Sequence, residues 1–176
     1  AGNREKLDTA LHFGADCVYL AGNKLGLRAY AGNFDNTELE TAVSVAHSLG
    51  KKVYVTVNVF AYEYDFVGLG EYLDYLEKLG VDAIIVSDAG IVSYCLKNNP
   101  ALSVHLSTQA STTNSYSVEF WRDLGVKRIV FGIEENKPLA IEAFSKYQDL
   151  EIVVLKKQYP MGSEKHLIYC ATGRKV

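Results

Sequence analysis

The chain has 176 residues, a length that suits one domain rather than two. Hydrophobic residues make up 48% of it and charged residues 22%, an ordinary globular composition that excludes an intrinsically disordered chain. The net charge of −3 provides no global basic field to attract nucleic acid, although a local basic patch remains open. No apolar run is long enough to cross a membrane, no signal peptide is visible, and the three cysteines are dispersed. We therefore expect a cytoplasmic protein with reduced thiols and no membrane partner.

The first elements in chain order are a helix, a strand and a long connection. "AGNREKL" opens on a helix signal, and "GADCVYLAG" predicts a strand near 17–21. The connection that follows, "GNKLGLRAYAGNF", is longer than most links between a strand and a helix, so it is a candidate lid or clamp. Arg28 is expected to anchor a carboxylate or phosphate of a substrate, and Tyr30 to contact it. A surface salt bridge is the alternative for Arg28.

The rest of the chain repeats one pattern. "NTELETAVSVAHSL" has helical periodicity, with Asn36 or Thr37 as its expected cap, and two further helical stretches follow it. These helices alternate with strands near 53–59, 83–87, 103–107, 128–131 and 151–155. Four strands follow a glycine that ends a helix, where left-handed backbone is often required: Gly14, Gly50, Gly80 and Gly125. Three of these glycines follow a leucine that can pack the last helical turn against the sheet: Leu49, Leu79 and Leu124.

Alternating strands and helices indicate a parallel sheet covered by helices, either open and doubly wound or closed as a (β/α)8 barrel. The strand "VYVTVNVF" favours the barrel, because its valines suit packing against helices while Thr56 and Asn58 suit a polar barrel mouth. No GxGxxG or Walker-type loop is present, which counts against a nucleotide-binding open sheet. We predict an α/β fold with an incomplete TIM-barrel-like parallel sheet of about six strands over residues 1–155, and a divergent tail at 156–176.

Functional groups in such a barrel lie at the carboxyl ends of the strands. "HLSTQASTTN" ends one strand in neutral hydrogen-bonding side chains, among which Ser107, Thr108 and Gln109 belong to the strand end itself. Residues 111–114 have the alternative role of capping the next helix. His105 is expected to be an interior histidine rather than a catalytic one.

Other strand ends supply similar groups. Thr56 and Asn58 end one strand, and Asp88 follows another as either a general base or the cap of the helix starting at Ala89. The tyrosines of "FAYEYDF" have three alternative predicted roles: stacking on a base, holding an extended peptide, or local packing only. We predict three catalytic residues, with Asp88 as the base and two orienting donors: Asp88, Gln109 and Asn58. The predicted substrate-binding residues are Arg28, Tyr30, Thr56, Ser107 and Thr108, and no metal motif is present.

Several ordered segments together resemble a known family. "AGNREKLDTALHFGADCVYLAG", "GLRAYAGNF", "AHSLGKKVYVTVNVF", "LGVDAIIVSDAG", "HLSTQASTTN" and "FWRDLGVKRIVF" are similar to the amino-terminal domain of collagenase-like proteases, family thirty-two of the peptidases of unknown catalytic type. The resemblance runs to about residue 132 and more loosely to Leu155. It implies a bacterial protein with a barrel-like domain and one of two activities, proteolysis of collagen-like substrates or oxygen-independent hydroxylation of RNA bases or quinone precursors.

The sequence departs from the family at both ends. The family has a strand ending in "AP" before the AGN, and a Gly-, Cys- and Ser-rich signature where this chain reads "KKQYPMGSEKHLIYCATGRKV". The hydroxylation members hold an iron–sulfur cluster with cysteines, which Cys17, Cys95 and Cys170 do not match. We therefore expect no cofactor in this chain and interpret it as a truncated member.

The leading functional prediction is a peptidase acting on collagen-like or unfolded protein, which truncation can leave inactive. The alternatives are an RNA-base hydroxylation protein for tRNA or rRNA, and a non-catalytic binding module. A basic surface near Lys51, Lys52, Lys127 and Arg128 would favour RNA, although these residues precede strands, opposite the mouth. Protein or peptide is the expected partner, RNA is a second, and open sheet edges favour self-association.

Overall fold

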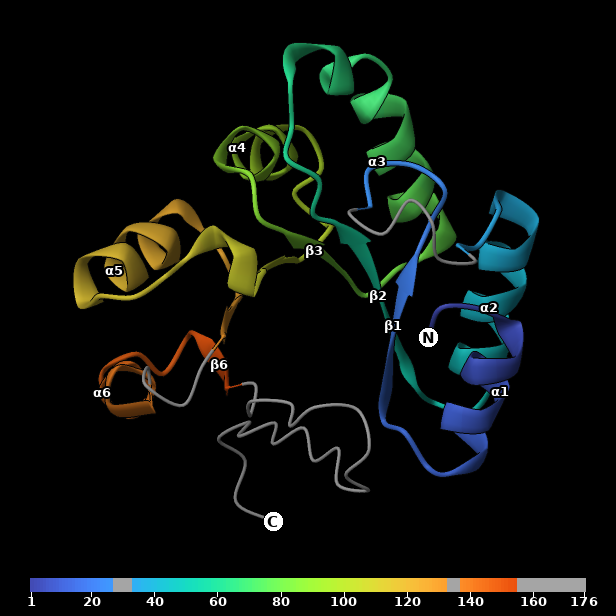
Figure 1. The fold of residues 1–176 in the computed structure, drawn as a ribbon, viewed down its shortest axis with the longest axis horizontal. Coiled ribbons are helices and arrows are strands. Elements are labelled where there is room, and N and C mark those ends of the chain that lie inside the picture. Colours follow the sequence, from blue (N-terminus) through green and yellow to red (C-terminus); the bar gives the residue numbers. More distant parts are fainter. Residues whose placement is uncertain (27–32, 133–136, 155–176) are drawn as a thin grey trace, which may run out of the picture. The chain divides into compact units, whose positions relative to one another are not determined.

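The computed structural model describes residues 1–26, 33–132 and 137–154 (Figure 1). By their packing the residues form two compact units, unit 1 from Ala1 to Val104 and unit 2 from His105 onward. The predicted boundary at residue 155 lies at the edge of the described residues and stays a prediction.

Unit 1 is built from strands and helices in strict alternation (Figure 1). β1 pairs with β2, and β2 with β3, in parallel. In chain order the elements are α1 (Arg4–His12), β1 (Cys17–Ala21), α2 (Asn36–Ser48), β2 (Lys52–Val57), the 3-10 helix η1 (Glu63–Phe66), α3 (Leu69–Leu79), β3 (Ala83–Val86) and α4 (Ala89–Asn98).

Unit 2 continues the same alternation. β4 begins at the boundary residue Val104 and pairs with β5, which pairs with β6, again in parallel. Its elements are β4 (Val104–Leu106), the 3-10 helix η2 (Thr108–Ala110), α5 (Ser115–Leu124), β5 (Arg128–Phe131), α6 (Lys137–Lys146) and β6 (Glu151–Val154).

These repeated strand–helix units confirm the predicted fold class. Parallel strands that pair in chain order with a helix after each strand are the building block of a TIM-type barrel, which needs eight strands to close. Six strands lie within the described residues, so the TIM-barrel-like sheet is incomplete there. No helix in the described part of the chain is both long enough and apolar enough to cross a membrane.

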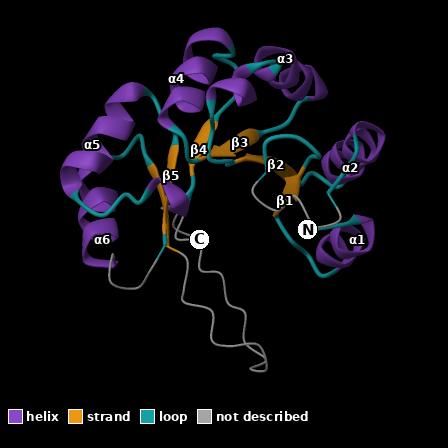
Figure 2. Cartoon of the chain, turned by 45° about the horizontal axis from the view of Figure 1, so that its top comes forward, coloured by secondary structure: helices purple, strands orange, loops and turns teal. Residues whose placement is uncertain are grey.

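The two faces of the unit 1 sheet differ as the sequence predicts. Val53, Val55 and Val57 alternate along β2, so they share one face, and all three are fully buried. Helices α2, α3 and α4 lie on one side of the unit 1 sheet (Figure 2). Tyr54 and Thr56 lie on the opposite face, which we call the inner face of unit 1, and Thr56 is only half-buried. The strand ends at Val57 rather than at Val59. The chain turns away there, and the Val59 N–H donates to the Leu25 carbonyl at 3.1 Å instead of to a strand.

The helix ends mostly match the sequence predictions, except for the cap of α2 and the packing of two leucines. Gly80 and Gly125 end α3 and α5 with φ of 80° and 114°, as the glycine pattern predicts. α2 is capped by Asp35, whose carboxylate accepts from the Glu38 N–H at 2.8 Å, so the cap precedes the predicted Asn36. Leu49 and Leu124 are 55% and 39% exposed, so they are not buried against the sheet as the sequence predicts.

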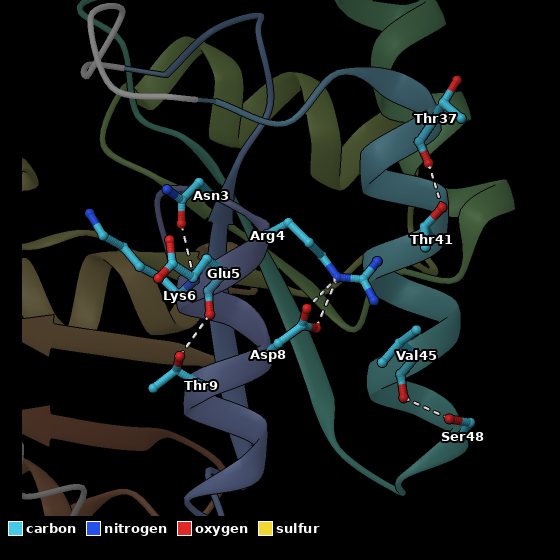
Figure 3. A network of polar contacts seen from close by, with 10 residues as sticks. All are labelled: Asn3, Arg4, Glu5, Lys6, Asp8, Thr9, Thr37, Thr41, Val45 and Ser48. Carbon is cyan, nitrogen blue, oxygen red and sulfur yellow. Dashed lines mark hydrogen bonds and ion pairs between the residues drawn. The ribbon is translucent and has the colours of Figure 1, made fainter.

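The solvent-facing sides of α1 and α2 are held by short-range polar contacts (Figure 3). The Asn3 side chain accepts from the Lys6 N–H at 3.0 Å and caps α1. One turn further, Arg4 Nε donates to Asp8 Oδ1 at 2.8 Å. In α2 the Thr41 hydroxyl donates to the Thr37 carbonyl at 2.9 Å. These contacts span only three or four residues, so they stabilise each helix without fixing its position on the sheet.

Candidate binding site at the strand ends

The carboxyl ends of β1 to β3 gather neutral polar groups in unit 1. Parallel register sets Ala21 of β1 beside Thr56 of β2, and Thr56 beside Ile85 of β3. The Thr56 hydroxyl donates to the Leu20 carbonyl at 3.3 Å. One step beyond the strands, the Ser87 hydroxyl donates to the backbone carbonyl of Asn58 at 3.2 Å. Adjacent parallel strands therefore bring the predicted Thr56 and Asn58 to one edge of the sheet, together with Ser87.

Asp88 follows β3 at the same edge and caps α4. Its Oδ1 accepts from the Ile91 N–H at 3.0 Å, which satisfies a donor at the start of the helix. Its backbone is extended, as a cap requires. The sequence left a general base and a helix cap as alternatives, and the structure shows the cap. One carboxylate oxygen thus accepts a hydrogen bond from the backbone, and the side chain lies half-buried at the strand end.

In unit 2 the strand end after β4 forms η2, and its hydroxyl and amide groups bond to each other. Ser107 is buried, and its hydroxyl accepts from the Gln109 N–H at 3.4 Å and donates to Gln109 Oε1 at 3.3 Å. Gln109 itself is exposed. Thr108 lies against Gly132 after β5, where an added Cβ would meet the Thr108 Cβ at 3.4 Å. Ser107, Thr108 and Gln109 therefore form one cluster of unit 2.

The alternative role predicted for residues 111–114 is found at one of them. Asn114 caps α5, with its side chain accepting from the Ser117 N–H at 2.9 Å. Thr112 is buried, and within the part of the chain that the structure describes its hydroxyl has no hydrogen-bond partner. His105 is buried within β4, as expected of an interior histidine. Arg28 and Tyr30 lie outside the described residues.

A close contact at the end of β1 was not predicted from the sequence. The ring of Tyr72, on α3, lies so near Gly22 that an added Cβ there would overlap the Tyr72 hydroxyl. That hydroxyl is buried and has no hydrogen-bond partner among the described residues, and burial together with Tyr75 raises the pKa of Tyr72 to about 12. Helical spacing identifies Tyr72 as a core residue but carries no signal for its contact with a glycine on another element.

Of the four residues predicted to form a basic surface that would favour RNA, two are paired with carboxylates, and Lys52 and Lys127 are exposed. In unit 1 Lys51 Nζ pairs with Asp16 at 3.0 Å. In unit 2 Arg128 is buried, and its Nε donates to Glu151 at 2.6 Å. The sequence grouped Arg128 with its neighbour Lys127 and did not predict this pairing. The pairing depends on which residue of β6 lies beside Arg128.

The described residues do not fit an iron–sulfur cluster. Among them, no group of three or more His, Cys, Asp and Glu side chains is placed to hold a metal ion. Cys95 is fully buried in α4, and burial, helped by Glu77, raises the pKa of its thiol to about 11, which disfavours the thiolate that a cluster needs. Cys17 is half-buried on the inner face of unit 1 and packs against the cluster that contains Tyr54. Cys170 lies outside the described residues.

Comparison with known proteins identifies the family. The family model described as peptidase family U32 matches residues 2–154. The chain belongs to peptidase family U32. This confirms the resemblance to collagenase-like proteases drawn from the sequence segments.

The curated relatives carry two kinds of name. The chain is 41% identical over 152 residues to tRNA hydroxylation protein P1 of Bacillus subtilis, covering 86% of this chain and 36% of that protein. It is 34% identical over 121 residues to a collagenase of Porphyromonas gingivalis, covering 68% of this chain and 29% of that protein. This U32 chain thus spans about a third of the length of these curated relatives.

A solved structure supports the fold. The structure of the U32 peptidase Mk0906 superposes with a TM-score of 0.70 at 22% identity, covering 86% of this chain and 64% of that one. At this level of identity the likeness concerns the fold alone.

Proposed function

We propose that this U32 chain takes part in tRNA hydroxylation and that the carboxyl ends of the strands in each unit contact bases of the RNA. The observation that carries the proposal is the 41% identity, over 86% of this chain, to a tRNA hydroxylation protein. The sequence favoured a peptidase over this alternative. The name of the B. subtilis relative favours tRNA hydroxylation instead.

The chemistry of the strand ends supports base recognition. Nucleobase edges present neutral donors and acceptors, which hydroxyl and amide side chains match without a full charge. Thr56 and Asn58 offer such groups in unit 1, as Ser107 and Gln109 do in unit 2. Because the described residues do not fit an iron–sulfur cluster, we assign them binding and positioning of the base and not the oxidation itself.

The proposal is tested by deleting the gene that encodes this chain and measuring tRNA nucleosides by mass spectrometry. We expect deletion to abolish a nucleoside one oxygen heavier than its parent, and the wild-type gene to restore it. Asn58→Ala and Gln109→Ala should restore roughly a tenth as much or less, the effect of a lost hydrogen bond of about 1.4 kcal/mol. Thr41→Ala, on the exposed side of α2, is the matched control and should restore the full level. An unchanged nucleoside profile after deletion would contradict the proposal.

A peptidase remains the second candidate, because the collagenase of P. gingivalis is 34% identical over 68% of this chain. In this case Asp88 is the proposed base. Asp88→Asn is the informative variant, because asparagine caps a helix as well as aspartate does but carries no carboxylate. New peptides from gelatin with the wild type, and none with Asp88→Asn, would support the peptidase. Binding of gelatin without cleavage would support a non-catalytic binding module. Self-association through sheet edges stays a prediction, checked by light scattering of the same sample.

A further inference from the structure

Two exposed tyrosines stand out in the segment between β2 and α3. Tyr62 and Tyr64 are 63% and 70% exposed, so they do not serve the core. Their rings stack on each other, with centroids 5.5 Å apart and planes inclined by 14°. The sequence left base stacking, contact with an extended peptide and local packing as alternatives for these tyrosines, and the structure shows that they pack on each other and not on the core. We call residues 60–67 the tyrosine segment (Figure 1).

The backbone holds the tyrosine segment in a defined conformation. Residues 63–66 form η1, and the Tyr62 N–H donates to Asp65 Oδ2 at 2.8 Å. The Asp65 N–H in turn donates to the Tyr62 carbonyl at 2.9 Å, and the Val67 N–H donates to the Tyr64 carbonyl at 3.2 Å. A surface that is already ordered loses little conformational entropy when a ligand binds. The backbone that carries the two rings is therefore already ordered before a flat ligand binds.

Phe66 fixes this segment beside the candidate site of unit 1. An added Cβ at Gly90 would lie 3.0 Å from Phe66 Cζ and 3.0 Å from Asp88 Oδ1. The Phe66 ring thus touches the start of α4, at the strand end that carries Asp88. Phe66 therefore ties the tyrosine segment to the start of α4, directly after the strand end of β3.

We propose that Tyr62 and Tyr64 form a stacking platform for an unpaired nucleobase of tRNA that lies beside the base held at the strand ends. This inference rests on the proposed function. Proteins recognise single-stranded RNA by stacking unpaired bases on aromatic side chains, which every base permits because each has a π-face. Phenol rings with most of their surface in solvent, next to a polar site, match that chemistry.

The charges in the tyrosine segment define which part of the RNA binds there. Glu63 is exposed and negative, and Asp65 holds the Tyr62 N–H. Phosphates are repelled from such a surface, so the contact consists of base stacking and not of ion pairs. A peptide rich in arginine or lysine would instead be attracted by Glu63. Removing this charge should therefore weaken the binding of such a peptide but not the binding of tRNA.

The test measures binding of fluorescently labelled total tRNA to the full chain by anisotropy at several salt concentrations. Replacing both rings, Tyr62→Ala with Tyr64→Ala, should weaken binding by about 5- to 100-fold, the loss typical of base stacking. Tyr62→Phe with Tyr64→Phe is the matched control and should stay within about twofold, because the rings remain. The salt dependence should be the same for all variants, since no phosphate contact is removed. Glu63→Gln should bind tRNA as well as the wild type or better.

The outcomes separate this inference from the proposed function. If the wild type binds tRNA and the double alanine variant, shown to be folded by circular dichroism, binds equally well, the platform is wrong and the proposed function stands. If the double phenylalanine variant loses as much affinity as the alanine variant, stacking is not the mechanism. Weaker tRNA binding by Glu63→Gln would contradict the expected repulsion between Glu63 and the phosphates and overturn the inference. Absence of any tRNA binding by the wild type would overturn both proposals.

Discussion

Unit 1 fills the inner face of its sheet with rings and methyl groups, whereas unit 2 puts charge on one face of its sheet. In unit 1 the register sets Tyr19 beside Tyr54, and Tyr54 beside Ala83. The two tyrosine rings meet edge to face with centroids 5.3 Å apart, and Tyr54 is buried against Ala83 and Ile85. Shape and apolar contact hold these neighbours together.

In unit 2 the corresponding row is polar. The register sets His105 beside Arg128, and Arg128 beside Glu151. Arg128 is buried, while the side chain of Glu151 is 52% exposed. Burying a guanidinium is tolerable only when its donors have acceptors, and the carboxylate on the neighbouring strand supplies one. The same strand pairing thus supports packing in one unit and charge neutralisation in the other, depending on which side chains the register aligns.

The largest effect is expected from removing the ring of Tyr54 in unit 1. Tyr54→Ala should lower the free energy of unfolding by about 3–5 kcal/mol, because it leaves a cavity between β1 and β3. Urea denaturation measures this change. Tyr54→Phe keeps the ring and should cost clearly less. Equal losses for the two variants would show that the hydroxyl, and not the packing, matters.

The matching change in unit 2 is Glu151→Ala. It removes a charged acceptor from the buried Arg128 and should cost about 2 kcal/mol. Asp149→Ala is the control, since its partner Arg122 lies at the surface, where an ion pair is screened and contributes little. High salt should reduce the effect of the Asp149 variant more than that of the Glu151 variant. If both variants behave alike, the contrast between the units is wrong.

Gly22→Ala tests how closely unit 1 is packed. The added Cβ meets the Tyr72 hydroxyl, so we expect a loss of about 1–2 kcal/mol from overpacking. Tyr72→Phe alone should be neutral or stabilising, because it removes a buried hydroxyl for which the described residues provide no partner. In the double variant the loss should largely disappear, since the next ring atom, Cζ, lies 3.5 Å from the added Cβ. Additive effects in this double-mutant cycle would contradict the contact.

The smallest effect concerns alkaline pH. Burial raises the pKa of Cys95 from 9.0 to about 11 and that of Tyr72 from 10.0 to about 12. Between the ordinary pKa and the raised pKa of each group, the folded chain keeps a proton that the unfolded chain has released. This contribution to stability is therefore fully present below pH 9.0 and is lost as pH rises. Urea midpoints measured against pH should fall less steeply for Cys95→Ala and for Tyr72→Phe. A flat profile for the wild type would contradict these pKa shifts.

The candidate site could be predicted where its placement depends on one strand and the turn after it. Asp88, Asn58 and Gln109 were found because each follows a recognisable apolar strand. A cap and a base have the same sequence signal at Asp88; the bond from the Ile91 N–H shows the cap, and the role as a base stays a prediction. The anchoring of Phe66 against Gly90 has no sequence signal, because the two residues belong to different elements.

The sequence alone determined the alternation of strands and helices, the glycine turns and the family, because these depend on patterns within a few neighbouring residues. The tertiary structure decided which side chains lie together. Arg128 and Glu151 pair across 23 residues of sequence, and Tyr72 meets Gly22 across two elements. Such contacts depend on the register between strands and on how each helix lies against the sheet. A shift of one residue would exchange the two faces of a strand, so only the assembled sheet fixes them.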